Sequence, residues 1–274
     1  MEVFIVGESG YDAEGVEAYL KHIGADGWSS ETEVDGQFLI ELAGRGCYQS
    51  FGTKLNLNIT KVRKGQEAYI RNLLASGHGS VLEHVLVNFR LCDVSRVFTA
   101  ELNRHRVGVA VSEESLRYVR SDHFAYNIPS CVANHPRGLA KYEKIMRYID
   151  HEKRELDEIM GLNDDIPFRL KKTISSATRR VLPMGMLVDT GWSANIRTIR
   201  HCLVLRTSEH AEEEIRQVFD KIALLCTERY PYLFQDMRRT VKNHIGEWAI
   251  VEVISVCLLE QRRFRFAKGS AGGR

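Results

Sequence analysis

The stretch that most constrains the structure and function of this chain is residues 101–120, ELNRHRVGVAVSEESLRYVR. It is too polar for a core and too ordered in composition for a disordered tail. Three basic residues, Arg104–Arg106, precede a loop that leads to Ser115, and Arg117 follows. Guanidinium groups are rigid forks that match phosphate oxygens, and the small Gly108 lets the backbone approach a ligand closely. The stretch therefore predicts an anion site, most directly for nucleotide phosphates.

A purely structural role would account for the same cations. Asp93 and Ser95 can cap a short helix that runs to about Asn103. Cations at the C-terminus of a helix complement its dipole and its free carbonyl groups. Spacing alone does not separate this alternative from a ligand site.

Composition limits the class of protein to which the chain can belong. The chain has 274 residues, of which 44% are hydrophobic, enough for one large domain with a substantial core. A net charge of +2 gives no overall drive toward nucleic acid or membrane. The six cysteines are scattered without a C-x-x-C pair, which favours reduced thiols in a cytoplasmic protein over a zinc site. No signal peptide and no apolar run of membrane-spanning length is recognisable.

Hydrophobic periodicity predicts both strands and helices. Apolar residues alternate over Val85–Leu91, which is typical of a strand with one buried face. They recur at helical spacing from Leu139 to Ile159, which predicts a long amphipathic helix whose charges form a solvated face. Further strands are expected at Val3–Val6 and Ile250–Val256, and further helices at Glu14–Ile23, Lys64–Leu74 and Glu209–Val218. Another helix is expected to begin at Phe38–Leu42 and to be broken by Gly44 and Gly46. A last helix is expected to begin at Asp165, with Pro167 in its first turn, and to end before Pro183.

Residues 190–212 join arginines to a helical pattern, for which Ser193 is the expected N-cap. A surface helix normally has one apolar side, whereas this one has two adjacent polar stripes, as a helix between two ligands would. The stripes are Arg197, His201 and Leu205 at positions i, i+4 and i+8, and Asn195, Cys202 and Arg206 at positions i, i+7 and i+11.

The R-H-R block with the following E-x-S-x-R-Y resembles the signature of the flavin-dependent thymidylate synthases, the ThyX family. Three further blocks resemble the family in the same order: G-H-x-S-x-x-E-H at residues 77–84, A-R-x-x-L-P near Arg179, and N-x-R-x-x-x-(H/N)-x-x-x-L-R at residues 195–206. The resemblance implies a single-domain α+β fold with an antiparallel sheet flanked by helices. It also implies a homotetramer with shared active sites. We therefore expect a catalytic domain over residues 1–262, followed by a basic, glycine-rich flexible tail at residues 263–274.

The resemblance implies C5-methylation of a uridine 5′-monophosphate. Methylenetetrahydrofolate would supply the carbon, reduced FAD the hydride, and NADPH would re-reduce FAD. Arg206 and Ser115 are the implied catalytic residues, Arg206 at the uracil ring and Ser115 as a positioning group rather than a nucleophile. The implied substrate contacts are Glu101, Glu113, Ser115, Arg117, Arg179 and Arg206, with Arg117 and Arg179 at the phosphate. The implied flavin contacts are Cys47, Ser80, Glu83, Arg104, His105, Arg106, Asn195, Arg197, His201 and Leu205.

Three departures from the family pattern stand out. Cys47 replaces a usual serine, and Glu101 replaces a frequent glutamine. The loop between R-H-R and Ser115 has eight residues, where seven are usual. We hypothesise that the longer loop makes room for a ribose 2′-hydroxyl, so that the substrate is dUMP, UMP or both. Methylation of UMP would place the chain in nucleoside-antibiotic biosynthesis.

Other classes of function fit less well. A flavin or nucleotide sensor without turnover is the main alternative, which the presence of Ser115, Arg179 and Arg206 disfavours. An RNA-binding role lacks a recognisable module and interleaved aromatics. His78 and His84 have no further ligands at a matching spacing, so no metal site is expected.

Overall fold

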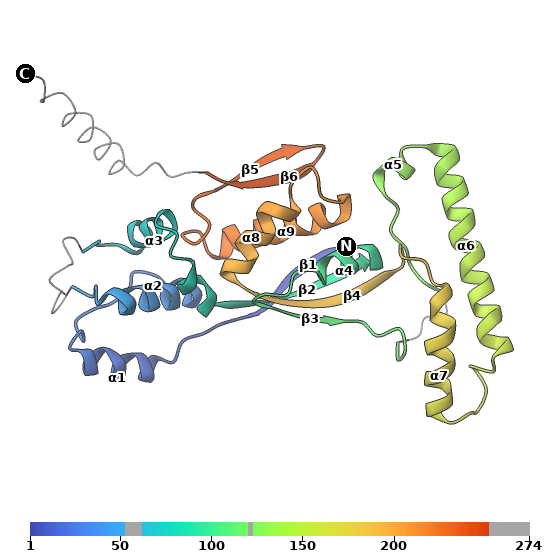
Figure 1. Cartoon of the computed structure of the whole chain (residues 1–274), viewed down its shortest axis with the longest axis horizontal. Helices are drawn as coiled ribbons and strands as arrows, with labels where there is room; N and C mark the ends of the chain where they lie inside the picture. Colours follow the sequence, from blue (N-terminus) through green and yellow to red (C-terminus); the bar gives the residue numbers. More distant parts are fainter. Residues whose placement is uncertain (53–61, 120–122, 252–274) are drawn as a thin grey trace, which may run out of the picture.

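The computed structural model describes residues 1–52, 62–119 and 123–251. Its central feature is a four-stranded antiparallel sheet with the strand order β1-β2-β4-β3 (Figure 1). The strands are β1 (Glu2–Glu8), β2 (Leu86–Ser95), β3 (Val109–Glu113) and β4 (Leu187–Asn195). The expected α+β class with an antiparallel sheet and flanking helices is confirmed.

The core lies between the two central strands and two helices, α8 (Ile196–Arg206) and α9 (Glu213–Arg229). Alternate residues of β2 are buried, as the sequence pattern predicts. The ring of Phe89 on β2 stacks on Trp192 of β4, with centroids 5.5 Å apart, and Trp192 meets Phe219 of α9 edge-on at 5.4 Å. Burial of these large rings supplies much of the apolar stabilisation that fixes α9 on the sheet.

Two strands pass directly into helices. β2 continues without a loop into α4 (Arg96–Leu102), and β4 continues into α8. Ser95 caps α4 by accepting a hydrogen bond from the Phe98 amide at 3.2 Å, as expected, whereas Asp93 precedes the helix at φ 56°. The cap of α8 is Asn195, which accepts from the Thr198 amide at 2.8 Å. The expected cap Ser193 lies inside β4 instead, because the strand extends further than the sequence pattern indicates.

The remaining elements lie around this centre (Figure 1). One end of the molecule carries α1 (Ala13–Ile23), α2 (Asp35–Tyr48) and α3 (Gln66–Ala75), and the other carries α5 (Ser130–Ala133), α6 (Pro136–Ile159) and α7 (Phe168–Thr178). Two short 3-10 turns, η1 (Gly79–His84) and η2 (Arg179–Val181), lead toward β2 and β4, and the hairpin of β5 (Met237–Lys242) and β6 (Ile245–Ile250) packs against α9 and α8.

The helix that was expected to break at Gly44 and Gly46 instead runs to Tyr48. Gly44 faces the neighbouring helix α3, where an added Cβ would lie 2.6 Å from the Tyr69 hydroxyl. The glycine therefore serves close helix packing rather than termination. Arg45, which follows it, is 4% exposed and pairs with the buried Glu41 one turn earlier.

Other boundaries also differ from expectation. The helix α7 begins at Phe168 after Pro167, so Asp165 lies outside it. The helix expected at Glu209–Val218 begins only at Glu213, where the Glu212 side chain caps it, and it runs to Arg229. The last described strand ends at Ile250, so most of the expected strand Ile250–Val256 and the tail at residues 263–274 lie outside the described residues. Within the described part of the chain, no helix is both long and apolar enough to cross a membrane.

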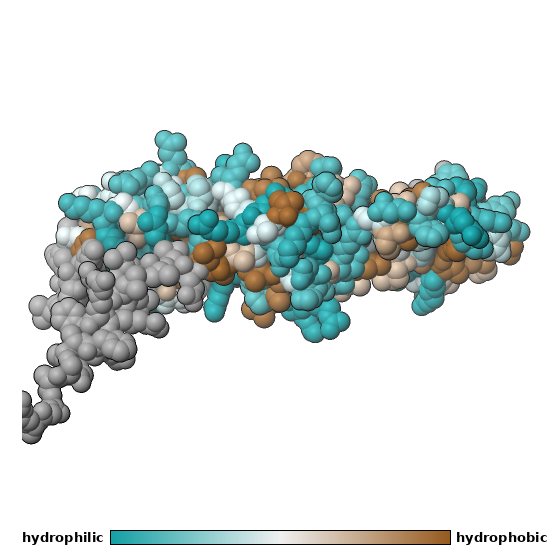
Figure 2. Space-filling model, turned by 90° about the horizontal axis from the view of Figure 1, so that it is seen from above, coloured by the Kyte–Doolittle hydropathy of each residue, from teal (hydrophilic) through white to brown (hydrophobic). Residues whose placement is uncertain are grey.

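Apolar side chains are exposed on the arm formed by α6 and α7. Ile159 is 74% exposed and Phe168 68% exposed. In the space-filling view, hydrophilic residues cover most of the visible face, and apolar residues gather along the edge at the end that carries this arm (Figure 2). The arm therefore exposes several large apolar side chains.

Candidate functional site

The first group of predicted residues meets where α4 and α8 end. Arg206, on the last turn of α8, donates from Nε to His105 Nε2 at 2.7 Å and from Nη1 to Glu101 Oε2 of α4 at 3.1 Å. On the other side of the imidazole, His105 Nδ1 lies 3.4 Å from Cys202 Sγ. Arg104, next to His105, is exposed. The fold therefore joins Glu101, His105 and Arg206, although about one hundred residues separate the first two from the third.

The electrostatics of this group favour a neutral imidazole. Burial lowers the pKa of His105, and the positive charges of Arg206 and His201 lower it further. Because Nε2 accepts a hydrogen bond from Arg206, the ring proton belongs on Nδ1, toward Cys202. Burial raises the pKa of the Cys202 thiol to about 12, so this sulfur stays protonated near neutral pH.

A second group lies between α2, η1 and the first turn of α8. Cys47, Ser80 and Arg197 line a hollow of about 340 Å³. Arg197 also forms an ion pair with Glu83 of η1. Gly79 lies so close that an added Cβ would come within 3.0 Å of Arg197 Nε, so glycine makes room for the guanidinium beside the hollow. Four predicted flavin contacts are therefore neighbours.

One of the two expected polar stripes of α8 faces solvent. Arg197, His201 and Leu205 are all exposed. The other stripe is largely internal: Cys202 is fully buried, and Asn195 is 8% exposed. In the protomer one stripe is thus open to solvent, and the other is mostly buried, with Arg206 partly exposed at its end.

Asn195 and the loop after the R-H-R block are in close contact. Gly108, at φ 69°, leaves room for the Asn195 side chain, whose Nδ2 would lie 2.4 Å from an added Cβ. Two hydrogen bonds hold this loop to the start of α8: the Asn195 amide donates to Gly108 O at 3.0 Å, and Thr198 Oγ1 donates to Val107 O at 2.9 Å. Arg106, which precedes the loop, remains exposed.

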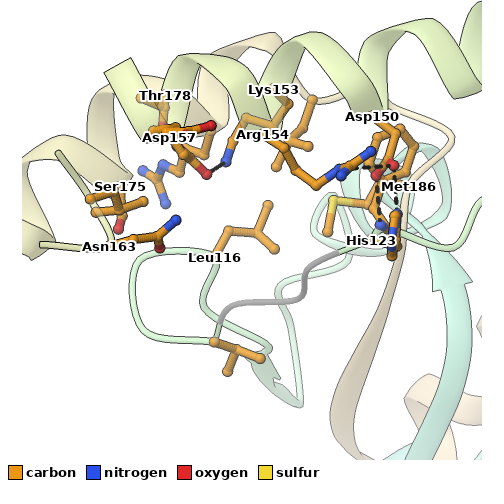
Figure 3. Close-up of a pocket in the computed structure, with 16 residues that line it drawn as sticks. Leu116, His123, Asp150, Lys153, Arg154, Asp157, Asn163, Ser175, Thr178 and Met186 are labelled. Carbon is orange, nitrogen blue, oxygen red and sulfur yellow. Dashed lines mark hydrogen bonds and ion pairs between the residues drawn. The ribbon is translucent and has the colours of Figure 1, made fainter. Parts of the chain in front are cut away.

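A third group surrounds a pocket of about 510 Å³ between α6, α7 and the segment after β3 (Figure 3). Arg179 lines the pocket, as do Leu116 and Val119, which flank Arg117 in sequence. The exposed Arg117 lies over the Tyr118 ring at 5.9 Å, and its amide donates to Ser115 Oγ at 3.4 Å. Arg179 therefore lines the pocket, and Arg117 belongs to a segment that borders it.

Glu113 stands apart from that pocket wall. It forms an ion pair with Arg96 of α4 at 2.8 Å, and both side chains are mostly buried. Arg96 Nη2 also donates to the Glu114 carbonyl at 3.1 Å, which fixes the end of β3 against the start of α4.

Sequence reasoning missed the part of the pocket wall that α6 contributes. Its charges were interpreted only as a solvated face, whereas five of them line the pocket: Asp150, Lys153, Arg154, Asp157 and Glu158. Asp150 accepts from His123 at 2.7 Å and lies 3.5 Å from Arg154, while Lys153 pairs with Asp157 (Figure 3). Their i, i+3 and i+4 spacing is ordinary for helix surface pairs, so the sequence held no signal that distinguished them.

Two atoms of this wall lack hydrogen-bond partners within the described residues. They are Thr178 Oγ1 and Asp157 Oδ1, and both are buried. Buried polar atoms are normally paired, so these two are available to a polar ligand or to water in the pocket.

The two histidines considered as metal ligands have other surroundings. The His78 ring stacks on Tyr48, with centroids 5.3 Å apart, and the Tyr48 hydroxyl lies 3.1 Å from His78 Nε2. The described residues hold one group of three potential metal ligands, which includes neither His78 nor His84. It consists of the exposed His151, Glu152 and Glu155.

The three groups do not form one site within the protomer. The pocket that Arg179 lines has none of Glu101, His105 and Arg206 among its lining residues. The fold is therefore that of an α+β protein with arginines in separate groups around an antiparallel sheet, and guanidinium groups suit anionic ligands such as phosphates.

Comparison with known proteins identifies the family. The family model described as thymidylate synthase complementing protein matches residues 31–232. The chain is 32% identical over 206 residues to the flavin-dependent thymidylate synthase of Mycobacteroides abscessus, covering 73% of this chain and 76% of the relative. It is 34% identical over 198 residues to that of Corynebacterium glutamicum, covering 70% and 75%. The chain belongs to the flavin-dependent thymidylate synthases, a family of enzymes.

Solved structures agree on the fold. The crystal structure of thymidylate synthase X from Helicobacter pylori with FAD and dUMP matches 86% of this chain and 98% of its own, with a TM-score of 0.55 at 19% identity. A second structure of that protein, also complexed with FAD and dUMP, gives a TM-score of 0.56. At this identity the likeness shows a shared fold.

Proposed function

We propose that this protein methylates C5 of a uridine 5′-monophosphate, with methylenetetrahydrofolate as carbon donor, FAD as the flavin and NADPH as its reductant. The observation that carries the proposal is the group of Glu101, His105 and Arg206, in which two acceptors fix the guanidinium of Arg206. The group occurs in a chain that belongs to this family. FAD, when bound, supplies the hydride. The chain's own residues bind and orient the nucleotide and stabilise charge on it.

The nucleotide contacts divide between phosphate and base. We assign the phosphate to Arg117 and Arg179 because both lie near the large pocket and neither forms an ion pair with a described residue. Ser115 would position the nucleotide. Arg206 Nη2 donates no hydrogen bond among the described residues, so it could donate to a carbonyl oxygen of the base and stabilise the enolate-like negative charge that makes C5 nucleophilic toward the one-carbon unit.

The flavin contacts fit a dinucleotide that binds across a surface. The hollow beside Arg197 offers a cation, a hydroxyl from Ser80 and a backbone made accessible by Gly79. Arg104, Arg106 and His201 are exposed cations or potential cations that would meet the remaining anionic part. Residues 1–262 would form the catalytic domain.

We propose a homotetramer in which neighbouring subunits complete each active site. Two observations support it: the group of Arg206 does not line the pocket of Arg179, and the arm of α6 and α7 exposes apolar side chains. Five cysteines lie in the described residues and all are unpaired, which fits a cytoplasmic enzyme.

Within this proposal, a narrower question is whether the enzyme prefers dUMP or UMP as its substrate. Of the eight residues between Arg106 and Ser115, Val109–Glu113 forms strand β3 rather than a loop, and the preceding Val107 and Gly108 form a turn hydrogen-bonded to the start of α8. A turn held beside the ribose would accept a 2′-hydroxyl only if a polar partner is left for it. UMP methylation in specialised metabolism is therefore the second candidate.

Anaerobic turnover tests the proposal. Purified protein is supplied with FAD, NADPH and methylenetetrahydrofolate, and dUMP and UMP are compared by product mass. We expect a mass gain of one methyl group on at least one nucleotide. A protein that binds FAD and nucleotide but forms no methylated product from either would be a sensor, and the catalytic proposal would be wrong.

A further inference from the structure

We propose that Arg96, the first residue of α4, is a positioning residue for the nucleotide. It acts through the end of β3, where it holds the peptide between Glu114 and Ser115 in the orientation that lets Ser115 meet the substrate. This inference rests on the proposed role of Ser115 and Arg117 in binding a uridine 5′-monophosphate.

Arg96 grips the end of β3 at two points. Its Nη1 lies 2.8 Å from Glu113 Oε1, and its Nη2 donates to the Glu114 carbonyl at 3.1 Å. Both partners of the ion pair are mostly buried, so salt screens this pair less than an exposed one. A planar, forked cation that holds a side chain and the adjacent backbone together sets the direction of the chain as well as its position.

The carbonyl that Arg96 holds belongs to the same peptide unit as the Ser115 amide. In a planar trans peptide the N–H points opposite to the C=O, so the Ser115 amide points away from the guanidinium. This amide donates no hydrogen bond within the described residues, which leaves it available to a ligand. A cation on the carbonyl also polarises the peptide, which makes its N–H a stronger donor to an anion.

The peptide that Arg96 fixes is the first link of a turn that carries Arg117. The amides of Tyr118 and Val119 donate to the Ser115 carbonyl at 3.0 and 2.9 Å, and the Arg117 amide donates to Ser115 Oγ at 3.4 Å. Because these bonds converge on Ser115, a rotation of the preceding peptide would redirect the whole turn. Arg96 therefore influences both proposed nucleotide contacts.

The base from which Arg96 reaches is rigid. Its own amide donates to the Met186 carbonyl at 3.1 Å. Ser95, the cap of α4, donates from its amide to Glu214 Oε1 of α9 at 2.7 Å, and its hydroxyl also bonds to this carboxylate. Both side chains are buried, so the start of α4 is fixed to the core.

The neighbouring strand β4 holds the other groups of Glu114 but not its carbonyl. The Glu114 amide donates to the Asp189 carbonyl at 2.9 Å, and the Asp189 amide donates to Glu114 Oε2 at 3.1 Å. These bonds keep Glu114 in the sheet when Arg96 is replaced. Loss of Arg96 should therefore release the peptide that follows Glu114 while β3 itself remains in place.

Two substitutions test the role of Arg96. Arg96→Met removes both contacts and keeps an apolar stem of similar length, whereas Arg96→Lys keeps the charge but lacks the planar fork that reaches two acceptors at once. FAD-loaded protein is titrated with dUMP and with UMP, and the nucleotide that the wild type binds more tightly is used. We expect its dissociation constant to rise about 10-fold in Arg96→Met, the range for a lost hydrogen bond to a charged group, and less in Arg96→Lys.

Steady-state kinetics adds a readout that a merely structural role would not give. In Arg96→Met, KM for the nucleotide should rise by the same factor, and kcat at saturating nucleotide should stay within about threefold of the wild type. Arg229→Met is the matched control. It breaks an ion pair to Glu8, a carboxylate of similar exposure on β1, which is the opposite edge strand from β3, and it should leave the nucleotide dissociation constant within about twofold.

A double-mutant cycle connects Arg96 to Ser115. If Arg96 acts by orienting Ser115, Arg96→Met should weaken nucleotide binding less in a Ser115→Ala background than in the wild type. Additive effects would overturn the inference, as would an unchanged dissociation constant in Arg96→Met or an equal rise in Arg229→Met. If Arg96→Met does not fold, the same titration and cycle with Arg96→Lys decide the matter.

Failure of the proposed function gives a different result. A wild type that binds nucleotide without methylating it would contradict the proposed reaction, whereas the effect of Arg96→Met on binding would still support the positioning role. A wild type that binds neither dUMP nor UMP would overturn both.

Discussion

At the scale of single residues, the proposed role of Arg206 depends on how its neighbours orient the guanidinium as much as on its charge. Its side chain is partly buried and is held at two of its three nitrogens. Arg206→Lys keeps the charge but presents a compact ammonium that cannot reproduce this planar, two-point arrangement.

We therefore expect Arg206→Lys to lower kcat/KM for the nucleotide about 100-fold, in the range for loss of one oriented donor at a developing charge. Steady-state kinetics at saturating FAD measures the change, and the flavin spectrum checks that FAD remains bound. Arg180→Lys is the matched control, because Arg180 is an exposed arginine bonded to the Ser176 carbonyl. Near-wild-type turnover in Arg206→Lys would remove Arg206 from the base contact.

At the scale of elements, the hairpin of β5 and β6 is bound to α9 by Asp220. Its carboxylate accepts from Arg239 twice, from Trp248 Nε1 at 2.8 Å and from the Gly246 amide at 2.7 Å. The hairpin in turn holds the end of α8, because the Trp248 amide donates to Thr207 Oγ1 at 2.8 Å, one residue after Arg206. A stable hairpin thus supports the geometry of the site.

Asp220→Asn should lower the free energy of unfolding by about 2–3 kcal/mol. The substitution removes the negative charge and replaces one acceptor oxygen by an NH2 group that faces other hydrogen-bond donors. Urea denaturation measures it, and Asp26→Asn in a loop is the control. Burial tends to raise the pKa of Asp220, but the bonds from Arg239, Trp248 and Gly246 outweigh burial and lower the pKa. The stabilisation from this group is therefore present at neutral pH and is lost as the pH falls below about 4, the ordinary aspartate range. An equal acid sensitivity in Asp220→Asn would contradict this.

Elements were predictable where periodicity and burial agree. The strand at residues 85–91 and the helices at residues 14–23 and 139–159 were found, because apolar residues recur at the period of the element. The run of α2 through Gly44 was missed, because the contact with Tyr69 that makes the glycine useful lies 25 residues away.

The candidate site was predictable as a set of residues but not as a geometry. Resemblance supplied Glu101, His105 and Arg206 separately. Their pairing requires the ends of α4 and α8 to meet, which no local pattern encodes. The pocket charges of α6 were missed for a related reason, since only the placement of α7 shows which side of α6 is enclosed.

At the scale of the whole molecule, the exposed apolar side chains of the arm of α6 and α7 make it the candidate interface of the proposed homotetramer. Ile159 is 74% exposed, so Ile159→Lys should change the stability of the protomer by no more than about 0.5 kcal/mol. If neighbouring subunits cover the arm, the same change places a charge in an apolar interface. We expect the assembly to dissociate toward smaller species in light scattering coupled to gel filtration. Glu17→Lys, at the opposite end of the molecule, should keep the wild-type mass, and an unchanged mass in Ile159→Lys would exclude this face from the interface.

The direct passage of β2 into α4 and of β4 into α8 has a consequence for motion. Because no loop intervenes, Glu101 and Arg206 are carried on segments continuous with the two most deeply buried strands. Local opening of that group would have to disrupt the same cooperative unit that gives the domain its stability, so its amides belong with the most slowly exchanging ones. If this group contacts the base as proposed, entry and release of ligands would rely on displacement elsewhere, in the peripheral helices or between the proposed subunits, while the group itself stays rigid.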